Sequence, residues 1–109
     1  MVAPLPQITN DERRARLARR HHLAARARAK TPLEVARALV GLHSTTASSV
    51  FLAAAARLRV PSVAAVDEAL YEARTLVRIL GMRRTMFVVP RELVAVIHAA
   101  CTRAIAVRE

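Results

Sequence analysis

The 109-residue sequence contains very little of several residue types, and each scarcity excludes a class of protein. Cys101 is the only cysteine, which rules out an intrachain disulfide and a disulfide-rich secreted scaffold. Two glycines and five prolines are too few for a low-complexity or disordered chain. No apolar run approaches the roughly 18 residues of a membrane span, because VFLAAAA stops at Arg57. The beginning carries Asp11 and Glu12 and lacks the apolar stretch of a secretory signal, so we expect a cytoplasmic protein.

The sequence also lacks the usual arrangements of catalytic and cofactor-binding residues. It has no glycine-rich phosphate loop, no Ser-His-acid set and no paired carboxylates in a recognisable site. His98 and Cys101 are three residues apart and share a helix face, but two ligands among Ala, Val and Ile favour a core position over a metal site. We therefore expect neither a cofactor nor a metal.

Positive charge is what the sequence has in excess. The formal net charge is +10, and Lys30 is the only lysine among eighteen basic residues, so the other seventeen are arginines. Such an excess favours a polyanionic partner, and we expect duplex DNA. A membrane surface fits less well, because residues 13–30 lack the large apolar face that such binding requires. Alternatively, some of the arginines reflect the codon bias of a GC-rich genome and not a function of the charge.

Helix start signals divide the chain into segments. Residues 1–8 carry two prolines and are predicted to form an extended arm. Thr9 and Glu12 form a capping box, so a helix starts there and carries basic residues from Arg13 to Lys30. This helix is either solvated or faces phosphates, which makes Arg13 and Arg14 candidate DNA contacts.

The later helices follow from apolar spacing. Thr31, Pro32 and Glu34 start a second helix that should end near His43. A third helix is predicted from after Thr46 to Leu58, a fourth from VPSV through Leu70, and a last one from Pro90 to the end at Glu109. The apolar side of the last helix could pack on a second copy of the chain or on additional domains.

Between the fourth and last helices the sequence predicts a β-hairpin. Leu76–Met82 and Met86–Val89 are rich in β-branched and large apolar residues, and they are joined near Arg83 and Arg84. Helices followed by a basic hairpin give a mainly α fold, a winged helix with a helix-turn-helix and a short β-hairpin wing. We expect a single such domain over residues 9–109.

Two groups of residues are candidate sites. Arg78, Arg83, Arg84 and Thr85 on the hairpin are predicted to contact DNA, and protection of a sheet edge is the alternative. The corner between the second and third helices contains His43, which either acts as a base or caps the second helix. Ser44, Thr45 and Thr46 are predicted to cap the third helix, where Ser48 and Ser49 could help to hold a phosphate.

Two segments carry a family resemblance. ARALVGLHSTTASSVFLAAAARL (residues 36–58) and ALYEARTLVRILGMRRTMFVVP (residues 69–90) resemble a bacterial family of winged helix DNA-binding proteins. That family includes the alkylpurine and crosslink DNA glycosylases of the AlkZ and YcaQ type. The resemblance covers roughly residues 8–105. It implies that the chain corresponds to the first winged helix unit of a longer architecture, as a truncated or N-terminal part of it.

The resemblance also bears on catalysis. Glycosylases of the family carry Gln-x-Gln or Gln-x-Asp where this chain has His43-Ser44-Thr45, and RGTLH where it has RRTMF, which places Phe87 at the histidine. Thr45 has neither a carboxylate nor an amide to activate water, although His43 could act as a base. The resemblance therefore favours a protein that is not an enzyme, and His43 and Thr45 are the catalytic candidates that remain. The expected function is binding of duplex DNA mainly through phosphates; a degenerate glycosylase and a protein-interaction or dimerisation module are the alternatives.

Overall fold

The computed structural model describes residues 3–108. The helices are α1 (Asn10–Arg20), α2 (Pro32–Leu39), α3 (Ala47–Ala55), α4 (Val63–Asp67), α5 (Val94–Ile97) and α6 (Arg103–Arg108). The strands are β1 (Leu42–His43), β2 (Leu76–Leu80) and β3 (Met86–Pro90). Short turns of 3-10 or π-helix lie between them: η1 (Ala25–Ala27), η2 (Glu68–Glu72), η3 (Met82–Arg84), η4 (Arg91–Leu93) and η5 (His98–Thr102).

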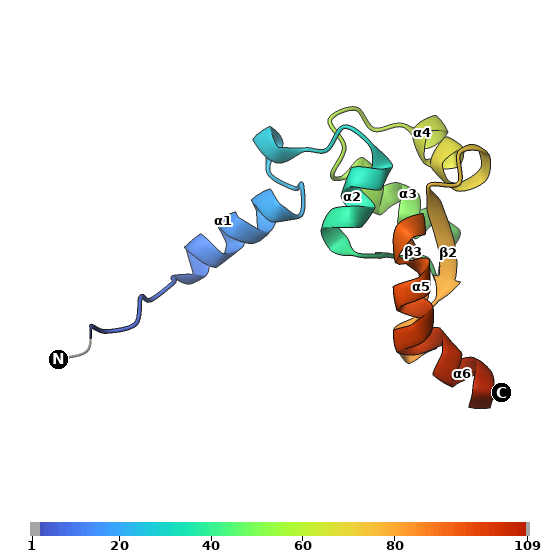
Figure 1. Ribbon diagram of the computed structural model, residues 1–109. Coiled ribbons are helices and arrows are strands. Elements are labelled where there is room, and N and C mark those ends of the chain that lie inside the picture. Colours follow the sequence, from blue (N-terminus) through green and yellow to red (C-terminus); the bar gives the residue numbers. More distant parts are fainter. Residues whose placement is uncertain (1–2, 109) are drawn as a thin grey trace.

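The predicted fold class is confirmed, because the structure is mainly helical with a small antiparallel sheet, consistent with a winged helix (Figure 1). The sheet has the order β1-β3-β2, with β3 in the middle. Arg78 of β2 lies opposite Val88 of β3, and Leu42 of β1 lies opposite the same valine from the other side. The predicted hairpin is therefore present, and β1 is a third strand that the sequence analysis did not predict.

Several predicted helix boundaries were wrong. The first helix ends at Arg20, because His22 has a φ of 61° and the N–H groups of Leu23 and Ala24 both return to the carbonyl of Ala18. The second helix ends at Leu39 and not near His43, because Val40 has a φ of 69° and the chain then enters β1. His43 therefore lies in a strand and does not cap a helix.

The other boundaries shift as well. The third helix ends at Ala55 and stops short of Leu58, which instead forms an isolated parallel bridge with Ala29. The fourth continues past Asp67 as the π-turn η2. The last segment begins as the 3-10 turn η4 and passes through α5, η5 and α6; its predicted end at Glu109 lies outside the described residues.

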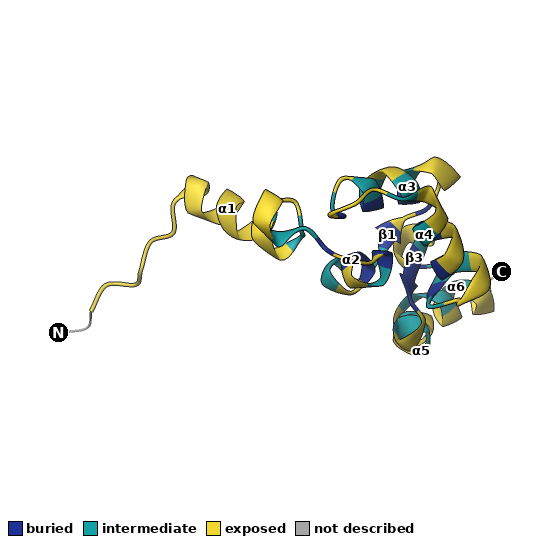
Figure 2. Ribbon diagram, turned by 90° about the horizontal axis from the view of Figure 1, so that it is seen from above, coloured by how far each residue is buried: buried dark blue, intermediate teal, exposed yellow. Residues whose placement is uncertain are grey.

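The core lies between α2, α3 and α4 and one face of the sheet. Val35 of α2, Val50 of α3 and Val66 of α4 are buried against Leu76 of β2 and Val88 of β3. Figure 2 shows this buried layer between exposed outer faces. Removal of such side chains from water supplies most of the stabilisation of a small domain.

The opposite face of the sheet is covered by the C-terminal helical segment. Ile97 and Cys101 face Phe87 and Val89 across a small apolar cavity of about 240 Å³. The hydroxyl of Thr102 donates to the carbonyl of Leu80, which fixes η5 to the end of β2. The outer side of the segment is exposed, and its apolar members there include Val96 and Val107.

The arm and α1 stand apart from this body. No residue of α1 is buried, and both views show the helix projecting away from the sheet and the other helices (Figures 1 and 2). The radius of gyration is 16.6 Å, whereas about 13 Å is expected for a compact chain of this length. In residues 3–108 no helix has the length and apolar character needed to cross a membrane.

Candidate nucleic-acid interface

The two hairpin arginines occupy the centre of the turn between β2 and β3. The N–H of Thr85 donates to the carbonyl of Met82 at 3.1 Å, and the N–H of Gly81 donates to the carbonyl of Thr85 at 2.8 Å. Arg83 and Arg84 between them both have a φ of 58°. Two consecutive positive φ values are the backbone of a type I′ hairpin turn, in which Asn-Gly is preferred.

Arginine is a costly choice at these positions. A residue with a Cβ loses about 1 kcal/mol in the left-handed region, because the Cβ approaches the following carbonyl oxygen. Arg83 and Arg84 are both exposed, so burial of apolar side chains does not repay this cost. The turn geometry thus places two guanidinium groups at the tip of the hairpin at the expense of backbone strain.

The corner after β1 lies at the same end of the sheet. The N–H of Ser44 donates to the carbonyl of Met86 at 2.8 Å, so the chain leaves β1 beside the turn. Ser44 is 2% exposed, whereas Thr45 is exposed. The fold therefore brings the His43-Ser44-Thr45 corner and the arginine turn together, although forty residues separate them in the sequence.

Arg78 joins the corner and not the hairpin tip. Its guanidinium donates from Nη2 to the carbonyl oxygen of Ser44 at 2.8 Å, across the width of the sheet. The bond directs the positive charge of β2 toward the corner and leaves other N–H groups of the guanidinium for a ligand. The sequence analysis predicted Arg78 as a DNA contact of the hairpin together with Arg83, Arg84 and Thr85, and the structure places its guanidinium beside Ser44.

His43 and Phe87 are direct partners across β1 and β3. Their ring centroids are 4.9 Å apart and the planes are tilted by 40°. The contact lies on the sheet face away from Ser44, since successive residues of a strand point to opposite faces. His43 and Phe87, two of the positions at which this chain differs from the motifs named in the sequence analysis, are thus neighbours in space.

The start of α3 does not have the predicted cap. Thr46 is the N-cap residue, but its side chain makes no capping hydrogen bond. The carbonyl of Ser44 is occupied by Arg78, and Ser48 is exposed while Ser49 is half-buried. Free N–H groups in the first turn of a helix carry partial positive charge and attract anions. This end of α3 therefore adds to the positive character of the corner.

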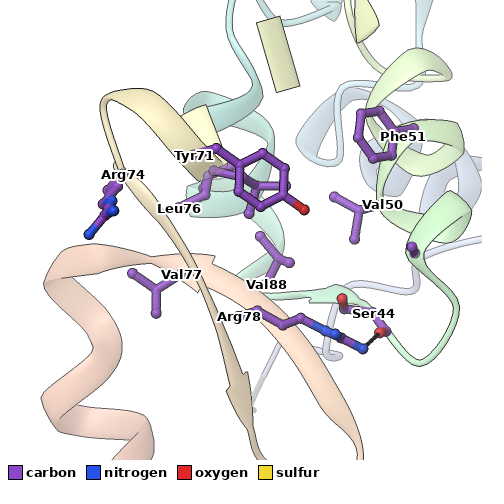
Figure 3. A pocket seen from close by; sticks show the side chains of 11 residues that line it. Ser44, Val50, Phe51, Tyr71, Arg74, Leu76, Val77, Arg78 and Val88 are labelled. Carbon is purple, nitrogen blue, oxygen red and sulfur yellow. Dashed lines mark hydrogen bonds between the residues drawn. The ribbon is translucent and has the colours of Figure 1, made fainter. Parts of the chain in front are cut away.

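A cavity of about 460 Å³ lies between α3, η2 and β2, beside the corner (Figure 3). Its apolar wall includes Val50, Phe51, Leu76 and Val88, and its polar lining is Ser44, Tyr71, Arg74 and Arg78. No acidic residue lines it in the described part of the chain. The sequence analysis missed Tyr71 and Arg74, because no spacing links these residues to Ser44 or Arg78.

The remaining predicted residues lie elsewhere. Arg13 and Arg14 are on α1, which projects from the body, and Arg14 pairs with Asp11 at 3.8 Å with both side chains largely exposed. The predicted core position is wrong for His98, which is exposed, whereas Cys101 is half-buried and faces an apolar cavity. Within residues 3–108 no group of three or more His, Cys, Asp or Glu side chains is placed to hold a metal ion.

One ion pair outside this interface connects α2 to η4. Nε of Arg37 in α2 donates to Oε1 of Glu92 in η4 at 2.6 Å. The hydrogen bond from Arg37, helped by the backbone at Glu92, lowers the pKa of the Glu92 carboxyl below its ordinary range. The pair holds α2 to the segment that follows β3.

Comparison with known proteins gives one match. No curated protein and no solved structure matches the chain significantly. A family model described as DNA glycosylase AlkZ-like matches residues 35–109, a range that starts within α2. Because that match covers well over half of the sequence, the chain belongs to the AlkZ-like DNA glycosylase family.

Proposed function

We propose that the chain is a winged-helix-type unit that binds duplex DNA mainly through backbone phosphates. The family to which it belongs is named for a DNA repair activity, and the net charge of +10 suits a polyanionic partner. The observation that carries the proposal is the hairpin turn, where Arg83 and Arg84 hold strained left-handed positions with both side chains exposed. Strain without a gain in packing is typical of positions kept for function.

The proposed contact surface combines the turn with the corner. Arg83, Arg84 and Thr85 form the wing, which meets phosphates or a narrow minor groove. The hydroxyls of Ser48 and Ser49 and the N–H groups at the start of α3 donate to a neighbouring phosphate, and Arg78 supports the corner through its hydrogen bond to the carbonyl of Ser44. Each neutralised phosphate contributes about 0.9 to the slope of log affinity against log salt concentration.

In this proposal α1 is a second and weaker DNA contact. Its five arginines include Arg13 and Arg14, and it is not fixed to the body by any buried residue. Attraction between such a helix and DNA is diffuse, because nothing fixes its orientation relative to the wing.

The test compares two doubly discharged variants. Duplex binding is measured by fluorescence anisotropy at two salt concentrations for the wild type, Arg83→Ala/Arg84→Ala and Arg13→Ala/Arg14→Ala. Alanine keeps the Cβ, so the backbone of the left-handed turn stays equally strained while both guanidinium groups are removed. We expect the hairpin variant to lose roughly tenfold in affinity and about 1.8 in the salt slope, and the α1 variant to lose clearly less. Equal losses in the two variants would overturn the proposal, because binding would then be attraction to a basic surface.

The structure gives no observation that favours catalysis at the corner. His43 is exposed and stacks on Phe87, and the two cavities beside the corner are lined by no carboxylate among the described residues. Activation of water needs a base within hydrogen-bond reach that is oriented by a further group. We therefore advance no enzymatic function.

A further inference from the structure

The cavity beside the corner has the composition of a ligand site. Its volume of about 460 Å³ is in the range of small-molecule pockets, which are mostly apolar with a few polar groups that fix orientation. It is formed by α3, η2 and β2, elements that the core holds together through Val50, Ala69 and Leu76. Its walls are therefore positioned by the fold and not by a loose segment.

Two aromatic rings give the cavity a preference for a flat ligand. Phe51 projects from α3, where it packs against the core, and Tyr71 projects from η2 (Figure 3). Tyr71 is 67% exposed, so its ring lies at the surface of the molecule. Its hydroxyl points toward the cavity (Figure 3). Rings of this kind bind planar groups by stacking or edge contacts.

The charges around the cavity select for an anion. Arg78 lies at the corner end beside Ser44, and Arg74 lies at the opposite edge (Figure 3). Ala47, the first residue of α3, also lines the cavity, so the uncapped and partly positive helix start faces the same space. No lining residue in the described part of the chain is acidic.

Arg74 supports this assignment through its backbone. It has a φ of 56° directly after the helical turn that contains Tyr71, where glycine is the usual residue. As at the hairpin turn, an arginine occupies a strained position in which its side chain is exposed. An arginine thus occupies a left-handed backbone position both at the hairpin turn and at the edge of this cavity.

We propose that this cavity binds a planar aromatic group carrying one acidic substituent, either a nucleoside monophosphate or an aromatic carboxylate. The ring lies against Tyr71 and Phe51, and the acidic group meets Arg78 and the start of α3. The site is for a free small molecule, so it does not depend on duplex binding by the wing.

The chain offers a direct probe of occupancy, because Tyr71 is its only tyrosine and it has no tryptophan. Proton NMR of the Tyr71 ring signals is followed while deoxyadenosine monophosphate or naphthoate is added. Deoxyadenosine and naphthalenemethanol are the neutral controls for the two ligands. Saturable shifts with either anion, and much weaker ones with its neutral control, are expected; the anion that binds identifies the source of the ligand. The absence of saturable shifts with both anions, or equal binding of the neutral controls, would overturn the proposal.

Three variants locate the binding. Ala47→Glu places a carboxylate at the start of α3, where it suits the helix but repels an anion in the cavity. Arg74→Gly removes a charge and relieves the left-handed backbone, so both variants are expected to fold. Arg13→Gln removes one positive charge from α1 and is the matched control. We expect the apparent Kd to rise roughly tenfold in the first two variants and to stay unchanged in Arg13→Gln. Unchanged binding in Ala47→Glu would place the ligand elsewhere and reject the site.

Discussion

The helix α1 and the hairpin turn both present arginines to solvent, but they do so under opposite local conditions. In α1 the Thr9 hydroxyl accepts from the N–H of Glu12 at 3.1 Å, acids lie in the first turn, and Arg19 and Arg20 lie in the last. Each of these features favours the helix. In the turn Arg83 and Arg84 occupy positions that disfavour any residue with a Cβ. Helix formation favours the arginines of α1, whereas the backbone of the turn disfavours arginine at both of its central positions.

The helix α1 and the body also differ in how much apolar side chain they bury. Leu58 in the body is 1% exposed and belongs to the core cluster, whereas Leu17 of α1 is 50% exposed. We expect Leu58→Ala to lower the free energy of unfolding by about 2–5 kcal/mol, through lost burial and the cavity left behind. Leu17→Ala should change it by less than about 0.5 kcal/mol. Urea denaturation of the two variants measures both values, and similar losses would mean that α1 packs on the body in solution.

The strain at the turn predicts a substitution that raises the free energy of unfolding, whereas Leu58→Ala lowers it. Arg83→Gly should raise the free energy of unfolding by about 0.5–1 kcal/mol, because the gain in the left-handed region exceeds the greater entropy of the unfolded glycine. The same change in α1, Arg13→Gly, should weaken the helix and leave global unfolding unchanged.

Urea denaturation reports the first effect and amide hydrogen exchange of α1 reports the second. A loss of stability in Arg83→Gly would show that the arginine side chain itself holds the turn, and the contrast between the regions would fail.

The smallest expected effect compares two ion pairs of equal length. Arg37–Glu92 in the body and Arg16–Glu12 in α1 both have N–O distances of 2.6 Å and partly exposed side chains. Because the folded-state pKa of Glu92 is lowered, the pair contributes stability above the ordinary glutamate pKa and loses it as the pH falls through the folded value. Glu92→Gln should flatten the acid side of the stability–pH curve slightly, and Glu12→Gln should leave global stability as it was. Thermal melts across the acidic range measure both.

The starts of helices were predictable from the sequence and their ends were not. Thr31 was expected to cap α2, and its hydroxyl accepts from the N–H of Glu34 at 3.2 Å. Such a cap depends on residues three apart, which a sequence displays directly. The early end of α3 accompanies a bridge between Leu58 and Ala29, two residues far apart in the chain. A long-range pairing of this kind overrides local propensity and leaves no local signal.

The candidate site divides in the same way. Charged residues between two short apolar runs lie at the tip of any hairpin, so the exposure of Arg83 and Arg84 followed from the pattern alone. The cavity did not, because α3, η2 and β2 meet only in the folded chain. Tyr71 and Arg74 have no spacing relation to Ser44, and the two-residue strand β1 is too short for a periodic pattern.

The short length of β1 also determines the order in which the strands of the sheet pair and separate. The hairpin of β2 and β3 closes over a short turn and forms on the microsecond scale, whereas β1 must pair with β3 from more than forty residues away in the sequence. Two paired residues therefore join the sheet late in folding and detach early in local fluctuations. The segment from Ser44 to Ser49 follows β1 directly, so its position depends on this pairing. A partner that reshapes the corner has to break these two residue pairs and the hydrogen bonds of Ser44 to Met86 and Arg78, and the hairpin and core stay closed while it does so.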